Sequence, residues 1–318
     1  MKILFDTDPG IDDAMALLML ARDPRAELVG VTTVFGNASI ETTTHNALAL
    51  CERFGLEVPI ARGAAQALVR PAGDFPEVVH GRDGMGNTNT LPPAQRRRAE
   101  RQTAPQLISE LARRHSGELV LVAVGPLTNL ALALRDDPQL VEHVRKVVVM
   151  GGAFGVNGHS GNVSPVAEAN AASDPHAADL VFTSRWDVTI VGLDVTHEVL
   201  MDGAYLDALG RDGGDEGAFI REITRHYENF YNARTGGGIY SHDPSAVACA
   251  LDPGAFTLRR GAVRVVGDGI AAGQTIQAIA GRAFPATDWN GLPAQAVCVG
   301  VDAPRLLAEY HACFIRST

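Results

Sequence analysis

The stretch KILFDTDPGIDDA, residues 2–14, places a strand, a tight turn and the start of a helix beside four carboxylates. The short apolar run at 3–5 is typical of a buried strand. Pro9-Gly10 predicts a turn, and apolar residues recur at helical spacing from Asp12 onward. In open α/β sheets, ligands bind at the carboxyl edge of the strands, so this stretch predicts a polar site after the first strand.

The four carboxylates of this stretch, Asp6, Asp8, Asp12 and Asp13, repel one another and need an offsetting charge. One interpretation is structural, because Asp12 and Asp13 suit the positive N-terminus of a helix and Asp8 suits the turn. The other interpretation is a bound hard cation, because Ca²⁺ and Mg²⁺ take carboxylate oxygens. Helix capping asks for one or two acids rather than four, and the stretch alone leaves both interpretations open.

The composition is typical of a globular protein with enough length for one large core: 318 residues, 46% hydrophobic and 20% charged. A formal net charge of -10 argues against a nucleic-acid partner. The chain shows no signal-peptide pattern and no apolar run as long as a membrane helix, so we expect no membrane partner. The four cysteines lack metal-ligand or redox spacing, which favours reduced core residues in a cytoplasmic protein.

Strand-like and helix-like patterns alternate through the first two thirds of the chain. Strands are expected at 28–34, 119–124, 146–150 and 188–193, and helices at 40–54, 103–115, 127–134 and 174–182. This alternation predicts the α/β class: an open, mostly parallel, Rossmann-like sheet with helices on both faces.

The remaining chain has a looser pattern. Helices are expected at 218–234, 242–251 and 305–314, and strands at 262–266, 275–279 and 294–299. Residues 66–93 are rich in Gly, Pro and Asn and predict a long loop, which is usually functional or disordered. Because no repeat and no linker is visible, we expect a single domain over 1–318.

Polar or glycine residues follow several of the expected strands. They occur at 36–37, 125–129, 151–152 and Asp194, and together they predict a polar crevice at the binding edge. Two later segments could reach this crevice. In residues 161–170, side-chain acceptors and donors suit a hydroxyl-rich ligand, although a plain polar loop explains them too. In residues 241–244, Asp243 is explained equally well as a helix cap and as part of a metal site beside His242.

The first stretch resembles the N-terminal fingerprint of the inosine–uridine-preferring nucleoside hydrolases. Further segments resemble blocks of that family in the same order: VFGN at 34–37, VGPLTNLA at 124–131, MGG at 150–152, 161–170, and HDP at 242–244. The resemblance covers nearly the whole chain. It implies the fold of that family and hydrolysis of the N-glycosidic bond of purine or pyrimidine ribonucleosides to free base and ribose.

The resemblance also implies a Ca²⁺ ion held by the side chains of Asp8, Asp13 and Asp243 and by the carbonyl of Val124. Asp8 would be the general base for a metal-bound water, and Asp12 would support the site and contact the sugar. All-oxygen ligation with several carboxylates is what calcium accepts. Val124 is implied by the resemblance alone, because a carbonyl ligand has no side-chain signature.

Other site residues follow from the same resemblance. Asn37, Asn162, Glu168 and Asn170 match positions that hold the ribose and the attacking water, and Met150 matches a position near the sugar. His242 is the expected general acid for the leaving base, and His80, in a loop that would close over the base, is the reserve candidate. Tyr227 and Tyr231 would close from the other side, or they belong to the core.

The base preference is left open, because neither closing segment contains a tryptophan for purine stacking. Two alternatives from other classes remain. In a haloacid-dehalogenase-like phosphatase, Asp6 would be phosphorylated, although Gly10 departs from that motif. A non-catalytic ribose- or nucleoside-binding protein would bind without turnover. For the favoured interpretation, the expected partners are a small-molecule ribonucleoside and further copies of the chain, as a dimer or tetramer.

Overall fold

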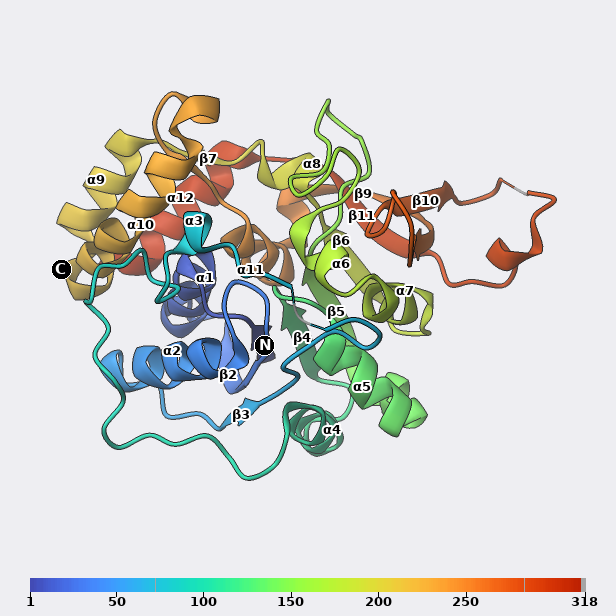
Figure 1. The fold of residues 1–318 in the computed structure, drawn as a ribbon, viewed down its shortest axis with the longest axis horizontal. Coiled ribbons are helices and arrows are strands. Elements are labelled where there is room, and N and C mark those ends of the chain that lie inside the picture. Colours follow the sequence, from blue (N-terminus) through green and yellow to red (C-terminus); the bar gives the residue numbers. More distant parts are fainter. Residues whose placement is uncertain (72, 283, 316–318) are drawn as a thin grey trace.

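A nine-stranded sheet forms the centre of the computed structural model, which describes residues 1–71, 73–282 and 284–315 (Figure 1). Its strand order is β10-β9-β11-β6-β5-β4-β1-β2-β3. In that order the strands are β10 (Thr275–Ile279), β9 (Phe256–Val265), β11 (Gln295–Val301), β6 (Val188–Val191), β5 (Val144–Met150), β4 (Leu119–Ala123), β1 (Lys2–Thr7), β2 (Glu27–Thr33) and β3 (Ile60–Arg62). Pairing is parallel from β3 to β11, and β9 is antiparallel to both neighbours. The mostly parallel sheet predicted from the alternating pattern is confirmed.

Helices cover both faces of this sheet, as the pleat of β1 requires. Ile3 and Phe5 point into one core and Leu4 into the other, because successive residues of a strand face opposite sides. The first core is covered by α1 (Ile11–Arg22), α2 (Ile40–Arg53), α10 (Gly214–Thr235), α11 (Asp243–Leu251) and α12 (Ala303–Phe314). The second core is covered by α4 (Ala104–Arg114), α5 (Thr128–Asp136) and α7 (Pro175–Thr183).

The remaining elements lie around the carboxyl edge and at the ends of the sheet. They are α3 (Glu77–His80), α6 (Ala169–Ser173), α8 (Leu193–Thr196), α9 (Gly203–Asp212) and the antiparallel pair β7 (Leu200–Met201) and β8 (Ile239–Tyr240). Short 3₁₀ turns are found at Pro138–Glu142, Pro253–Ala255 and Thr287–Trp289. Figure 1 shows α9 and α10 at one end of the molecule and β9 and β10 at the other.

The strand order reverses direction between β1 and β4. From β1 the chain moves through β2 to β3 on one side, and later returns to β4, β5 and β6 on the other. A crevice opens outside the carboxyl ends of two strands at such a switch point. Asp8 follows β1 and Val124 follows β4, so the topology places both at this crevice.

The expected elements differ from the structure mainly in their ends and in the short pieces. The sequence pattern missed β3, α9 and the β7–β8 pair, and it began β9 six residues late. In its described residues, 66–71 and 73–93, the expected long loop contains only the single turn of α3. Among the described residues, no helix combines the length and the apolar character that crossing a bilayer requires.

Candidate active site

A cavity of about 250 Å³ lies at the carboxyl ends of β1, β4 and β5. Every predicted site residue except Asp13 lines it: Asp8, Asp12, Asn37, His80, Val124, Met150, Asn162, Glu168, Asn170, Tyr227, Tyr231, His242 and Asp243. These residues come from the ends of β1, β4 and β5, from α1, α3, α6, α10 and α11, and from the loops between them. The structure therefore brings together residues that are up to 235 positions apart in the sequence, Asp8 and Asp243 being the extremes.

Asp13 lies behind the cavity and organises the turn between β1 and α1. Its Oδ1 accepts hydrogen bonds from Thr7 Oγ1 at 2.5 Å and from the backbone N–H of Asp8 at 3.1 Å. Its Oδ2 accepts from the backbone N–H of Gly10 at 3.0 Å and from Asn37 Nδ2 at 2.8 Å. Four donors hold this carboxylate in place, so the structural interpretation applies to Asp13, and the same bonds fix it beside other carboxylates.

Three buried carboxylates converge at this point. Asp12, Asp13 and Asp243 each offer an oxygen within 4.8 Å of the others. Burial raises the pKa of Asp243 well above its usual value, and the charges of Asp12 and Asp13 raise it further. Burial likewise raises the pKa of Asp12 to about 7, with the Asp13 carboxylate as the next cause. Such a group of like charges is stable when protons or a cation neutralise it, and an all-oxygen set suits a hard cation.

Asp8 is held in a space that only glycines leave open. A Cβ atom on Gly36 would lie 2.0 Å from Asp8 Oδ2, and one on Gly125 would lie 2.5 Å from Asp8 Oδ1. Oδ2 accepts a hydrogen bond from the backbone N–H of Asn37 at 2.7 Å, whereas Oδ1 is buried without a hydrogen-bond partner in the described part of the chain. A buried, unpartnered carboxylate oxygen beside three other acids fits a cation or a reactive water.

The opposite wall of the cavity carries a fixed carboxylate and two amides. Glu168 accepts backbone hydrogen bonds from Asn170 at 2.8 Å, Gly152 at 2.8 Å and Ala171 at 3.0 Å. Burial nevertheless raises the pKa of Glu168, against the lowering effect of these three bonds. Asn170 Nδ2 donates to the carbonyl of Val124 at 2.7 Å, which leaves a second lone pair of that oxygen available.

One wall of the cavity carries His242, at the start of α11, together with Tyr227 and Tyr231 of α10. His242 Nε2 is 2.9 Å from Tyr231 Oη, and Tyr227 donates to Asp12 Oδ2 at 3.2 Å. Burial lowers the pKa of His242 well below its usual value, with the neighbouring His197 and His80 as further causes. Tyr227 and Tyr231 belong to the hydrophobic core and also line the cavity, so the two interpretations of these residues do not exclude each other.

His80 closes the cavity from the 66–93 loop. Its Nδ1 accepts a hydrogen bond from the backbone N–H of Ile11 at 3.3 Å, and its ring lies 5.5 Å from that of Tyr227. Burial lowers the pKa of His80 to about 3, and the positive form is further disfavoured by His226. The loop is thus joined to the start of α1 next to the acidic stretch.

Sequence reasoning missed several residues of the cavity wall. They include Asp74, Pro76, Val79, Val163, Ser173 and Arg234. Helical spacing could have found Arg234, since it follows Tyr227 by seven positions on α10. The loop residues had no comparable signal.

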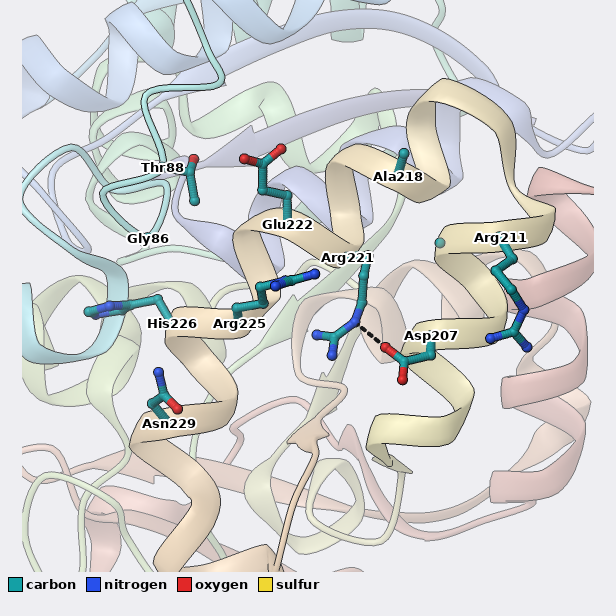
Figure 2. Close-up of a pocket in the computed structure, with 11 residues that line it drawn as sticks. Gly86, Thr88, Asp207, Arg211, Ala218, Arg221, Glu222, Arg225, His226 and Asn229 are labelled. Carbon is teal, nitrogen blue, oxygen red and sulfur yellow. Dashed lines mark hydrogen bonds and ion pairs between the residues drawn. The ribbon is translucent and has the colours of Figure 1, made fainter.

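A second hollow, of about 710 Å³, lies between α9, α10 and residues 86–88 (Figure 2). It is larger than the first cavity, and two of its charged side chains already pair with each other, since Arg221 Nε donates to Asp207 Oδ1 at 2.6 Å. It also contains none of the converging carboxylates. The chemistry therefore favours the smaller cavity as the active site.

Comparison with known proteins points to one family. The family model described as inosine-uridine preferring nucleoside hydrolase matches residues 3–308. A probable uridine nucleosidase 1 of Oryza sativa subsp. japonica is 39% identical over 310 residues, 96% of this chain and 94% of that protein. A solved plant nucleoside hydrolase is 37% identical with a TM-score of 0.94, over 99% of both chains. A purine-preferring ribonucleoside hydrolase from Gardnerella vaginalis is 33% identical with a TM-score of 0.90, over 99% of this chain and 98% of that chain.

Proposed function

This chain belongs to the inosine-uridine preferring nucleoside hydrolases, which hydrolyse the N-glycosyl bond of ribonucleosides, and we propose that it does so with Ca²⁺ and with Asp8 as general base. The observation that carries the proposal is the position of Asp8: it lines the cavity, and its Oδ1 is buried without a hydrogen-bond partner among the described residues. Incubation with a panel of purine and pyrimidine nucleosides, followed by an assay of reducing sugar, tests it.

The proposed calcium ligands are the side chains of Asp8, Asp13 and Asp243 and the carbonyl of Val124. Asp12 is an alternative to Asp8 as a ligand, because its Oδ1 is also buried without a partner and it belongs to the converging carboxylates. We assign Asp12 to the sugar, as the resemblance implies, since Tyr227 already holds its other oxygen. When bound, calcium would orient the 2′- and 3′-hydroxyls and lower the pKa of a water.

Hydrolysis then depends on the groups that surround the sugar. Breaking the bond at C1′ builds positive charge on the ribose ring, and nearby carboxylates and amide oxygens stabilise it. Glu168, fixed by three backbone hydrogen bonds, supplies such a charge without reorganising. Asp8 would take the proton of the water as it attacks C1′, and His242 would support the leaving base with a proton or a hydrogen bond.

The phosphatase alternative has less support in the geometry. Asp6, the residue it would phosphorylate, is buried and does not line the cavity. Its Oδ1 accepts hydrogen bonds from Thr32 Oγ1 and from Asn129 Nδ2, which ties it to β2 and to α5. A cytoplasmic location and a homo-oligomeric state stay predictions from the sequence.

Inversion at C1′ is the expected stereochemical result. Direct attack by water gives one displacement and no covalent sugar intermediate, so α-ribose should appear first from a β-nucleoside. NMR of the anomers during the first turnovers decides this. If β-ribose appears first, a carboxylate acts as nucleophile and the assignment of Asp8 as a base fails.

The substitution Gly125→Ala is expected to slow hydrolysis by about 10²-fold, because the added methyl group would displace the Asp8 carboxylate by a large part of an ångström. The effect should appear in kcat, measured with inosine and uridine. Gly203→Ala is the matched control: a Cβ there would meet Glu228 at an ordinary 3.4 Å, so its kcat should be unchanged. Full activity in Gly125→Ala would mean that the position of Asp8 is not critical.

A further inference from the structure

Thr196 contacts His242, which lines the active-site cavity. It is the last residue of α8, directly after β6, and it is fully buried. Its Oγ1 lies 2.8 Å from His242 Nδ1, and within the described ranges that nitrogen is its one hydrogen-bond partner. On the other side of the imidazole, Nε2 is 2.9 Å from Tyr231 Oη, which lines the cavity.

A neutral imidazole carries one hydrogen, on Nδ1 or on Nε2, and its partners decide which. The phenol of Tyr231 can donate or accept a hydrogen bond, so it does not determine which nitrogen carries the hydrogen. The hydroxyl of Thr196 is a buried donor and needs an acceptor for its hydrogen, because an unsatisfied buried donor costs free energy. The carbonyl of Gly192, one turn earlier, already accepts from the N–H groups of Val195 and Thr196, each at 3.1 Å, and makes no bond to Thr196 Oγ1. The acceptor left for this hydrogen is His242 Nδ1.

We propose that Thr196 is a positioning residue that fixes His242 as the tautomer with its hydrogen on Nε2. Thr196 Oγ1 donates to Nδ1, Nε2–H donates to the phenol oxygen of Tyr231, and the Tyr231 hydroxyl hydrogen is then free to donate into the cavity. In this arrangement, the hydrogen bond to the leaving base comes from the Tyr231 hydroxyl, and His242 acts by holding that phenol oxygen, with no net transfer of the imidazole proton. The use of this tautomer in catalysis rests on the proposed function, whereas the tautomer itself does not.

The ¹⁵N NMR spectrum of the histidine side chains measures the tautomer directly, without any substrate. In calcium-loaded protein labelled with ¹⁵N-histidine, the His242 signals are those missing from His242→Asn. We expect Nδ1 to show the shift of a nitrogen without hydrogen and Nε2 that of a protonated one. Thr196→Val should bring a population with hydrogen on Nδ1, and Thr196→Ser, which keeps the hydroxyl, should restore the original spectrum.

Kinetics then test what the tautomer does. Thr196→Val should lower kcat for inosine at least tenfold, a smaller loss than the roughly 10²- to 10⁴-fold expected for removal of a general acid, and leave p-nitrophenyl riboside nearly unchanged. Thr196→Ser should recover most of the loss. Thr189→Val is the matched control, because Thr189 is equally buried on β6 and its hydroxyl makes no hydrogen bond in the described structure. It should change neither the spectrum nor the rates.

The two measurements separate the inference from the proposed function. A wild-type spectrum with hydrogen on Nδ1, or an unchanged tautomer in Thr196→Val, overturns the role of Thr196 whatever the rates. The expected spectra combined with equal losses on both substrates would support the tautomer and overturn the catalytic role of His242.

Discussion

Replacement of Asp243 by alanine is expected to lower kcat for nucleoside hydrolysis by about 10³-fold or more through loss of the bound calcium. A metal supplies several kcal/mol of stabilisation to a transition state, and each 1.36 kcal/mol corresponds to a factor of ten. Asp243 is buried at the first turn of α11, where its carboxylate meets those of Asp12 and Asp13. Calcium per chain, measured by elemental analysis after dialysis, should fall together with the rate of reducing-sugar release.

Matched variants separate metal loss from misfolding. Asp243→Asn keeps the size of the side chain and should also lose calcium while remaining folded by circular dichroism. Asp252→Ala, at the other end of α11, removes an acid that pairs with Arg305 away from the cavity, and it should keep both calcium and activity. Asp12→Asn should retain calcium if Asp8 is the ligand. Stoichiometric calcium with full activity in Asp243→Ala would remove Asp243 from the site.

The second large effect concerns His242. His242→Ala should slow inosine hydrolysis by roughly 10²- to 10⁴-fold and leave p-nitrophenyl riboside hydrolysis nearly unchanged. Hypoxanthine needs a proton or hydrogen bonds as it leaves, whereas p-nitrophenolate leaves without either. Steady-state kcat values for the two substrates measure the difference.

His80→Ala is the comparison for this experiment, because His80 lines the same cavity from the 66–93 loop. A selective loss on inosine in His80→Ala, with none in His242→Ala, would transfer the role to His80. Equal losses on both substrates in His242→Ala would mean that this side chain only packs beside the metal site. Either outcome would leave the calcium ligands unaffected.

The first strand and helix could be predicted because local chemistry determines them. The apolar run at 3–5 lies within β1, which extends over Lys2–Thr7, and α1 begins at Ile11, one residue before the expected start at Asp12. β3 was missed because three residues at an edge of the sheet carry too little pattern. α9 was missed because Gly203 and Gly210 weaken a helical signal, so contacts with α10 and α12 must stabilise it.

For the site, too, residues that are neighbours in the sequence could be predicted, whereas contacts formed only on folding could not. Asp8, Asp12 and Asp13 were found because they are neighbours in the sequence, and the sheet topology explains why they meet Asp243. Thr196 could not be found, because a threonine in an apolar segment has no signature and its contact with His242 arises only on folding.

Calcium titration of the chelator-treated protein tests the central claim most directly, with inosine and uridine hydrolysis followed at each addition. We predict that the metal-free protein is inactive and that activity returns in proportion to occupancy, reaching its maximum at one calcium ion per chain. Undiminished hydrolysis by protein shown to be metal-free would contradict this account, as would nucleoside binding without turnover in the fully loaded protein.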